Sequence, residues 1–139
     1  MRQHQQSLVV ETYGKGLYDF TDPLRAIVAQ SKVQTGLATV YVTHTSASLL
    51  IQENADVEVQ RDLERFFARL VPEGDPLFRH VDEGPDDMPA HVRAALTQTS
   101  VNIPIQEGKA ALGTWQGMFL YEHRNKPYSR TVIVHIIGA

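Results

Sequence analysis

The chain has 139 residues, which is the size of one domain and enough to bury roughly 70% of its unfolded surface. Its formal net charge of −3 disfavours the basic footprint by which proteins bind nucleic acid or anionic membranes. The absence of cysteine excludes disulfides and thiolate metal sites and fits a reducing compartment. No apolar run reaches the length of a membrane span or a signal peptide. We therefore expect a single cytoplasmic domain over residues 1–139.

The first third of the chain predicts strands around one helix. A helix start is indicated by Thr21-Asp22-Pro23, in which a capping side chain precedes proline, and Gly36 is expected to end that helix. His44 shares the parity of the apolar residues in the strand before it, so it is expected to project from the same face. The strands are expected at residues 7–12, 17–20 and 37–43, with a turn at 14–16.

Residues 56–71 carry the clearest helical pattern. Apolar residues recur on one face, and Pro72 and Gly74 follow the last of them. A shorter helix is expected to open at Pro89, with the Asp87 side chain as its cap. The apolar face of the first helix consists of Val59, Leu63, Phe66, Phe67 and Leu70.

The last third of the chain is dominated by strands, which we expect at residues 101–105, 112–121 and 131–137. The final strand is apolar on both faces and therefore must be covered on both. Strands in the majority, with two or three helices between them, predict an α+β fold, namely an antiparallel β-sandwich in a single domain.

The segment from His80 to His91, HVDEGPDDMPAH, is hard to explain as a simple connection. Turns use glycine, proline and aspartate, but they do not require histidine at both ends of an acidic run. Histidine and carboxylate together are what a divalent metal or a proton-transfer site requires. The carboxylates of this segment are Asp82, Glu83, Asp86 and Asp87.

Three histidines are candidates for a metal site if the fold brings them together. His44, His80 and His91 would then act as neutral imidazoles on one divalent ion, leaving a fourth position open as in catalytic zinc sites. Zinc is the expected metal, with magnesium as the alternative if the carboxylates supply oxygen ligands. The opposing interpretation is that these histidines are separate and hydrogen-bonded on the surface. His135 is expected to face the core or an interface.

Other side chains suggest proton transfer and phosphate binding. Asp86 is the preferred catalytic carboxylate, because Asp87 is assigned to capping. Ser46 is a second catalytic candidate beside His44, although no GxSxG elbow surrounds it. Hydroxyls near His44 and a cation would hold a phosphate group. The phosphate-binding candidates are Thr45, Ser46, Ser48 and Arg124, with Arg130 or Lys109 as alternative cations.

Several segments together resemble the YjbQ family in order and spacing. They are HTSASL at residues 44–49, Asn54, DDMPAH at 86–91 and LGTWQG at 112–117. The resemblance covers nearly the whole chain and implies a trimeric α+β sandwich. It also implies activity as a secondary thiamine-phosphate synthase, which joins a pyrimidine diphosphate to a thiazole phosphate and releases pyrophosphate. The matching HTSAS and DDMPAH positions are implied to line the site, which strengthens the three-histidine hypothesis.

Two functional hypotheses follow. The first is a metal-dependent enzyme that acts on phosphorylated small molecules and assembles as a homotrimer. The second is a non-catalytic trimeric module that binds a metal or an anion. Neither hypothesis involves nucleic acid or a membrane as a partner.

Overall fold

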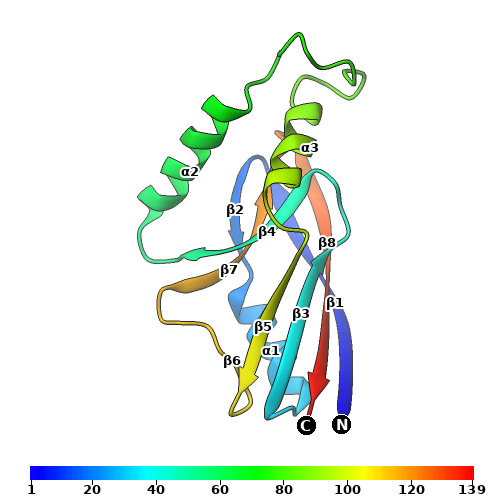
Figure 1. Cartoon of the computed structure of the whole chain (residues 1–139), viewed down its shortest axis with the longest axis vertical. Helices are drawn as coiled ribbons and strands as arrows, with labels where there is room; N and C mark the ends of the chain where they lie inside the picture. The colour runs from blue at the N-terminus through cyan, green and yellow to red at the C-terminus, as the bar shows by residue number, and fades with distance from the viewer.

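The computed structural model describes all 139 residues and contains two antiparallel sheets with three helices (Figure 1). The larger sheet has the strand order β1-β8-β3-β5-β6, and the smaller one has the order β2-β7-β4. The predicted α+β class with antiparallel sheets is therefore confirmed. No helix is both long and apolar enough to cross a membrane. The strands are β1 (Arg2–Tyr13), β2 (Gly16–Asp19), β3 (Thr35–Val42), β4 (Ala47–Glu53), β5 (Ser100–Gln106), β6 (Lys109–Ala110), β7 (Gln116–Glu122) and β8 (Pro127–Gly138). The helices are α1 (Thr21–Ser31), α2 (Val57–Leu70) and α3 (Asp87–Leu96).

The core lies between the two sheets and is closed by α1. Alternate residues of β3 and β8 point inward, and their side chains are almost completely buried. Leu24 and Val28 of α1 pack onto this inner face, and Leu49 and Leu120 of the smaller sheet complete the cluster. Burying each such side chain stabilises the fold by about 1.5–3 kcal/mol.

One predicted boundary is wrong for an identifiable reason. The helix α1 ends at Ser31 rather than near Gly36, because Lys32 adopts a left-handed conformation with φ of 60° and its N–H donates to the Ala29 carbonyl. Gly36 instead lies in β3 opposite Gly138, where a Cβ atom would stand 2.3 Å from the Ile137 carbonyl oxygen. This glycine is needed for the close approach of two strands.

The smaller sheet was only partly predicted. β7 begins at Gln116 rather than at residue 112, because the Gln116 side chain turns back and accepts a hydrogen bond from the Gly113 N–H at 2.8 Å. β4 was not predicted at all, although it pairs with β7 along its length. Ser48 is consequently part of a buried strand rather than of an exposed loop.

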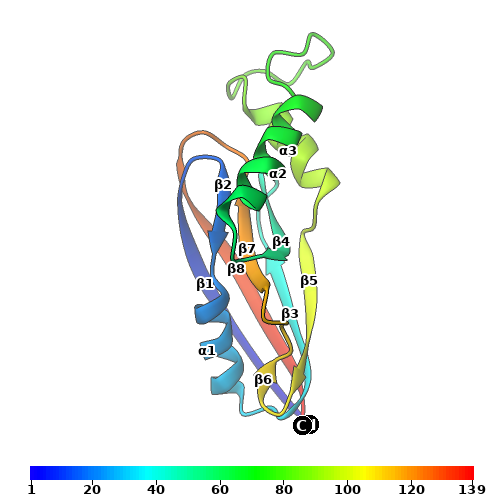
Figure 2. The same ribbon diagram turned by 90° about the vertical axis from the view of Figure 1, so that its left-hand side faces the viewer.

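The helix α2 is amphipathic as predicted, and Asp56 caps its N-terminus by accepting a hydrogen bond from the Glu58 N–H at 2.9 Å. No residue of this helix is buried. It runs beside the smaller sheet and away from the larger one (Figure 2). Glu64 connects α2 to α3 and β7, because it accepts hydrogen bonds from Arg93 at 2.8 Å and from the Tyr121 hydroxyl at 3.1 Å.

The side of the larger sheet that points away from the core is called the outer face here. It is formed by the outward-pointing residues of β1, β8, β3 and β5, as their alternating burial and pairing register define them. These residues are Gln3, Gln5, Ser7, Val9 and Glu11; Ser129, Thr131, Ile133, His135 and Ile137; Leu37, Thr39 and Tyr41; and Ser100, Asn102, Pro104 and Gln106.

Candidate metal centre

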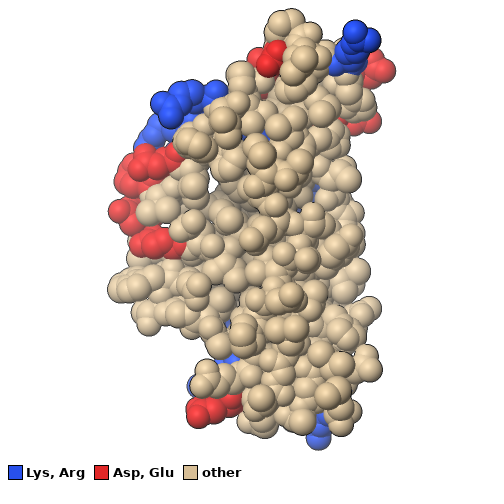
Figure 3. Space-filling view, viewed as in Figure 1, with Lys and Arg blue, Asp and Glu red and all other residues tan.

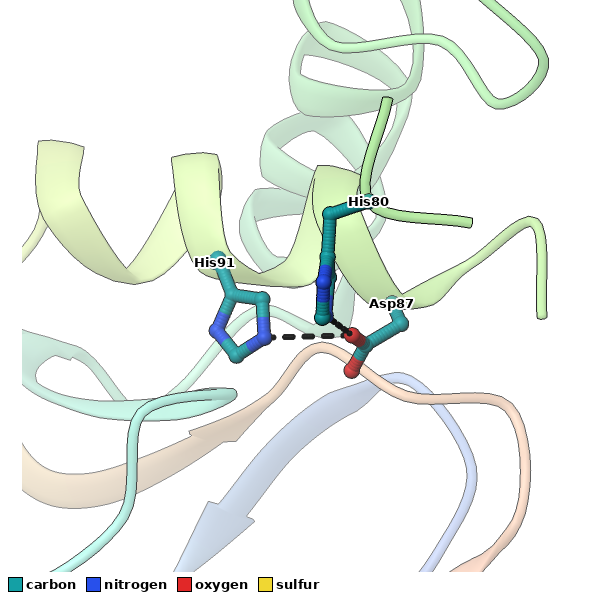
Figure 4. A group of neighbouring side chains, drawn as sticks. All are labelled: His80, Asp87 and His91. Carbon is teal, nitrogen blue, oxygen red and sulfur yellow. Dashed lines mark hydrogen bonds and ion pairs between the residues drawn. The ribbon is translucent and has the colours of Figure 1, made fainter. Parts of the chain in front are cut away.

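The start of α3 brings two histidines and one carboxylate together. Asp87 and His91 lie four positions apart on this helix, so their side chains share a face. His80 reaches the same point from the preceding loop, as Figure 4 shows. One oxygen of Asp87, Oδ2, lies 2.9 Å from Nε2 of His80 and 3.1 Å from Nε2 of His91. We call these three residues the α3 cluster. Their potential ligand atoms all lie within 4.8 Å of one another.

The other ring nitrogen of His91 fixes its tautomer. Nδ1 lies 2.9 Å from the backbone carbonyl oxygen of Thr45, which can only accept a hydrogen bond. Nδ1 therefore carries the proton, and in a neutral ring Nε2 presents its lone pair to Oδ2 of Asp87. Two lone pairs at 3.1 Å repel each other. The arrangement is favourable only with a cation between them, either a second proton on the ring or a metal ion.

Arg124 holds the carboxylates behind the α3 cluster. Its Nε donates to Asp86 at 2.9 Å, one terminal nitrogen donates to Oδ1 of Asp87 at 2.8 Å, and the other donates to the Glu83 carbonyl at 2.9 Å. The guanidinium also lies over the Tyr128 ring. Because Oδ1 of Asp87 is occupied in this way, Oδ2 is the oxygen that faces the histidines. Arg124 is buried and its donors are used by these three contacts, while the phosphate contact expected from the sequence stays a prediction.

The structure gives neither aspartate the role that the sequence suggested. Asp87 was expected to cap α3, but it is the first residue of the helix and its side chain faces Arg124 and the histidines. Asp86, the expected catalytic group, precedes the helix without a capping hydrogen bond. It accepts from Arg124 and from the Asn125 N–H, each at 2.9 Å. Burial raises the pKa of Asp86, but these hydrogen bonds outweigh burial and the net pKa is lowered.

His44 does not join the α3 cluster. Its Nε2 lies 2.9 Å from the Thr131 N–H, which can only donate, so the lone pair of Nε2 is already used. Its Nδ1 faces Arg130 at 3.5 Å. Burial and the charge of Arg130 lower the pKa of His44. Of the three predicted histidines, the structure therefore brings His80 and His91 together, with Asp87, and leaves His44 apart from them.

The serines after His44 also lie apart from the α3 cluster. Ser46 is buried, and its hydroxyl accepts a hydrogen bond from Arg130 at 3.0 Å. Arg130 in turn makes two hydrogen bonds to the fully buried Glu122, at 2.7 and 2.5 Å. Glu122 also accepts from Thr12 at 2.6 Å. Thr45 is exposed and contributes its backbone carbonyl to His91.

Ser48 pairs with a buried histidine. Its hydroxyl lies 2.9 Å from Nε2 of His123, and neither residue is accessible to solvent. Nδ1 of His123 has no hydrogen-bond partner. Burial is the main cause that lowers the pKa of His123 to about 3, and nearby Arg93 and Arg130 act in the same direction. His123 is thus neutral and has a structural role. We call His44, Ser46, Ser48, Glu122, His123 and Arg130 the buried network.

An open groove of about 640 Å³ lies beside His91, between α3 and the end of β3. Its walls supply imidazoles, hydroxyls and small apolar side chains, and none of the lining residues is an acid, a lysine or an arginine. A smaller pocket of about 240 Å³ adjoins His80 on the loop side. The groove is lined by Tyr41, Val42, Thr43, His44, Thr45, His91, Ala94, Ala95 and Thr99.

The chemistry of the α3 cluster fits a divalent ion. Two imidazoles and one carboxylate form a ligand set used by catalytic zinc, in which adjacent ligand atoms are about 3.3 Å apart around the ion. The distances of 2.9 and 3.1 Å from Asp87 to the two histidines are close to this value. Arg124 and the Thr45 carbonyl supply the outer contacts that orient metal ligands.

Sequence reasoning missed Asp87 as a cluster member. The signal was available in the four-residue spacing of Asp87 and His91. Residues at this spacing share one face of a helix, and α3 starts at Asp87. The capping assignment hid it, because a helix predicted to start at Pro89 leaves Asp87 outside the helix.

Comparison with known proteins places these features in a family. The family described as "UPF0047 protein YjbQ-like" matches residues 6–139. A UPF0047 protein of Synechocystis sp. is 59% identical over 99% of this chain and 93% of its own length. The UPF0047 protein YjbQ of Escherichia coli O157:H7 is 38% identical over 97% of this chain and 98% of its own.

Solved structures agree with the fold. A protein of unknown function from Sulfolobus solfataricus has a TM-score of 0.89 at 25% identity and covers 99% of each chain. A YjbQ/UPF0047 family protein from Clostridium acetobutylicum has a TM-score of 0.86 at 35% identity, over 95% of this chain and 99% of its own.

Proposed function

The chain belongs to the UPF0047 family of YjbQ-like proteins, and we propose that it is a metal-dependent enzyme acting on phosphorylated small molecules in the cytoplasm. The metal would be zinc, held by His80, Asp87 and His91. The homotrimer that the resemblance implied is part of this proposal.

One observation carries the metal assignment. His91 donates its Nδ1 proton to Thr45, so its Nε2 lone pair points at a carboxylate oxygen that His80 also approaches. Two imidazole nitrogens converging on one buried carboxylate form a ready ligand set. The alternative to a metal ion is a second proton on the His91 ring. The test of the metal assignment must distinguish these two.

The reaction to test first is thiamine-phosphate synthesis. The C–O bond between the pyrimidine methylene and pyrophosphate breaks, its electron pair leaves with pyrophosphate, and the thiazole nitrogen forms the new C–N bond. A divalent ion held by His80, Asp87 and His91 would supply charge stabilisation for the leaving pyrophosphate. The chain itself would orient the ion through Arg124 and Asp87 and would present the groove beside His91 to the organic part of the substrate.

A non-catalytic binding module is the second candidate, and one observation favours it. Both catalytic groups expected from the sequence are engaged: Asp86 is held by Arg124 and Asn125, and Ser46 is buried against Arg130. A site that binds a metal and an anion needs no free acid or base.

The test measures zinc content and turnover in matched variants. We expect the wild-type protein to bind zinc, and His91→Ala and Asp87→Asn to lose about 100-fold or more in zinc affinity, because each removes a ligand. His44→Ala is the matched control and should retain zinc. Zinc binding that is unchanged in His91→Ala would contradict the metal assignment. Thiamine-phosphate formation from its two precursors then separates the enzyme from the binding module.

A further inference from the structure

The outer face of the larger sheet has a counterpart in the smaller sheet, where one side also points away from the core. Tyr121 and His123 of β7 point to this side, because residues two apart in a strand share a face. Ser48 is the cross-strand partner of Tyr121 and faces the same way. The Tyr121 hydroxyl donates to Glu64 of α2 at 3.1 Å, and Arg93 of α3 donates to the other oxygen of Glu64 at 2.8 Å. We call these five residues the Arg93 site.

Arg93 is buried without its full set of hydrogen bonds. It is 1% exposed, yet only Nη1 of its guanidinium donates a hydrogen bond, and Nε is buried without a partner. In Arg124 and Arg130, by contrast, Nε and both terminal nitrogens are used. Nε and Nη2 form the edge of a guanidinium that can hold a carboxylate or phosphate by parallel hydrogen bonds. In Arg93 this edge is free to bind an anion.

The positive charge of Arg93 is also weakly compensated. Its ion pair is with Glu64, whose side chain is 31% exposed and is therefore screened by water. Figure 3 shows acidic and basic side chains next to one another over α2, and the exposed carboxylates of this helix pair with arginines one turn away. Arg130 faces the fully buried Glu122 instead. A buried cation with a screened partner favours the binding of a further anion.

His123 supplies a second buried polar atom without a partner. Its Nε2 lies 2.9 Å from the Ser48 hydroxyl, which can donate to this nitrogen, and Nδ1 then carries the ring proton. Nδ1 has no hydrogen-bond partner, although His123 is inaccessible to solvent. Burial lowers the pKa of His123 most, and Arg93 is the charge that lowers it most. Arg93 and His123 therefore lie close enough to act on one ligand.

A pocket of about 320 Å³ between α2 and β2 adjoins the Arg93 site. Glu64 and Tyr121 line the pocket and belong to the Arg93 site, so the pocket leads toward it. Lys15 and Arg61 also line the pocket, and cations at an entrance attract anions. Because no residue of α2 is buried, this helix can yield to a ligand at low cost. The apolar part of the lining consists of Leu17, Tyr18 and Val57.

We propose that the Arg93 site binds the carboxylate of a small organic acid, which enters between α2 and β2. The carboxylate would accept hydrogen bonds from Nε and Nη2 of Arg93 and from Nδ1 of His123. A singly charged carboxylate is favoured over a phosphate dianion, because Glu64 already shares the guanidinium and repels a dianion more strongly. The apolar walls and small volume of the pocket fit a short hydrocarbon body.

The Arg93 site is separate from the α3 cluster. His91 and Arg93 are two positions apart on α3, which is about 200° around the helix axis, so their side chains leave it on opposite sides. No residue of the Arg93 site is a potential ligand of the α3 cluster. Carboxylate binding at Arg93 therefore goes beyond the proposed function and does not depend on a bound metal.

The experiment measures butyrate binding by calorimetry in the wild-type protein and in three variants, with circular dichroism to verify folding. Arg93→Lys keeps the charge but removes the bidentate edge. Glu64→Gln removes the carboxylate that shares the guanidinium. Arg25→Lys is the matched control, because it makes the same substitution at an exposed arginine of α1. Butyramide, the neutral analogue of butyrate, tests the need for charge, and inorganic phosphate tests the choice of anion.

We expect the wild-type and Arg25→Lys proteins to bind butyrate equally well, and butyramide and phosphate more weakly. Butyrate affinity should fall about tenfold or more in Arg93→Lys, because the paired hydrogen bonds are lost. It should rise several-fold in Glu64→Gln, because the guanidinium then has no competing carboxylate. A purely structural Arg93 would give no such increase. A crystal soaked with butyrate should show its carboxylate within hydrogen-bond distance of Nε of Arg93 and Nδ1 of His123.

A wild-type protein that does not bind butyrate, or an affinity unchanged in Arg93→Lys and Glu64→Gln, would overturn the inference. A soaked crystal with only water beside Arg93 would do the same. Phosphate that binds more tightly than butyrate would overturn the choice of a carboxylate. Butyrate affinity that appears only with added zinc would place the anion at the α3 cluster instead. If Arg93→Lys does not fold, Glu64→Gln decides, and a butyrate affinity that does not rise there contradicts the Arg93 site.

Discussion

The α3 cluster and the buried network both combine histidine with acidic side chains, yet the fold uses them in opposite ways. In the buried network, Glu122 is satisfied by Arg130 and Thr12, and the Nε2 lone pair of His44 is used by a backbone N–H. In the α3 cluster, His80 and His91 both turn a nitrogen toward one carboxylate oxygen. A nitrogen lone pair that no backbone N–H uses, and not the presence of histidine alone, therefore marks the candidate site.

The largest effect is expected from breaking the buried network. Glu122→Gln should lower the free energy of unfolding by about 3–5 kcal/mol, because it leaves the buried Arg130 guanidinium without its carboxylate. Urea denaturation measures this change. Glu58→Gln, which removes exposed ion pairs with Arg61 and Arg65, is the control and should cost less than about 1 kcal/mol. Equal losses in the two variants would show that the buried network is not the stabilising element assumed here.

A smaller effect, on zinc affinity, is expected from changing Arg124, the residue that orients Asp87 in the α3 cluster. Arg124→Lys keeps the charge but cannot make the three hydrogen bonds to Asp86, Asp87 and the Glu83 carbonyl together. Zinc affinity should fall about 10–100-fold, as is typical when an orienting contact is removed. Competition with a chromogenic chelator measures it, with the exposed neighbour changed in Lys126→Ala as the control. An Arg124→Lys protein with wild-type zinc affinity would remove Arg124 from the site.

The effect that is smallest near neutral pH concerns His123, because it develops only as the pH falls. Its folded-state pKa is lowered to about 3 from 6.5, so between these values the unfolded chain binds a proton that the folded chain does not. The contribution of His123 to stability is therefore complete above pH 6.5 and is lost at about 1.4 kcal/mol per pH unit as the pH falls below it. Urea denaturation at several pH values should show a shallower acid dependence for His123→Gln. Identical slopes in the two proteins would contradict a buried neutral His123.

The sequence predicted the fold class, most strands and α2 because hydrophobic periodicity and capping residues are local signals. It did not predict β4, since Ser48, Leu49 and Ile51 read as a mixed polar and apolar segment until β7 is placed beside them. Sequence reasoning also assigned His44 to the site, because alternate residues of a strand point to the same face and His44 follows apolar residues in this alternation. The Thr131 N–H donates to the lone pair of His44, and these residues are far apart in the sequence. No local sequence pattern predicts such a contact.

Asp86 and Asp87 show the same limit of prediction from sequence. Asp86 and Asp87 are adjacent and chemically identical, so only the position of Arg124 decides which of them faces the histidines. That position depends on how the turn between β7 and β8 meets the start of α3. The sequence located the acidic segment correctly, but the division of roles within it depends on tertiary contacts.

The loose attachment of α2 has a consequence for how fast a bound ion would leave. His80 stands on the segment that joins α2 to α3, whereas Asp87 and His91 belong to α3. No α2 residue is buried, so we expect this helix and the loop after it to open at a lower free energy than the sheets. Each opening would withdraw one ligand and leave two in place. The residence time of the ion would then follow the frequency of local opening and not the global stability of the domain.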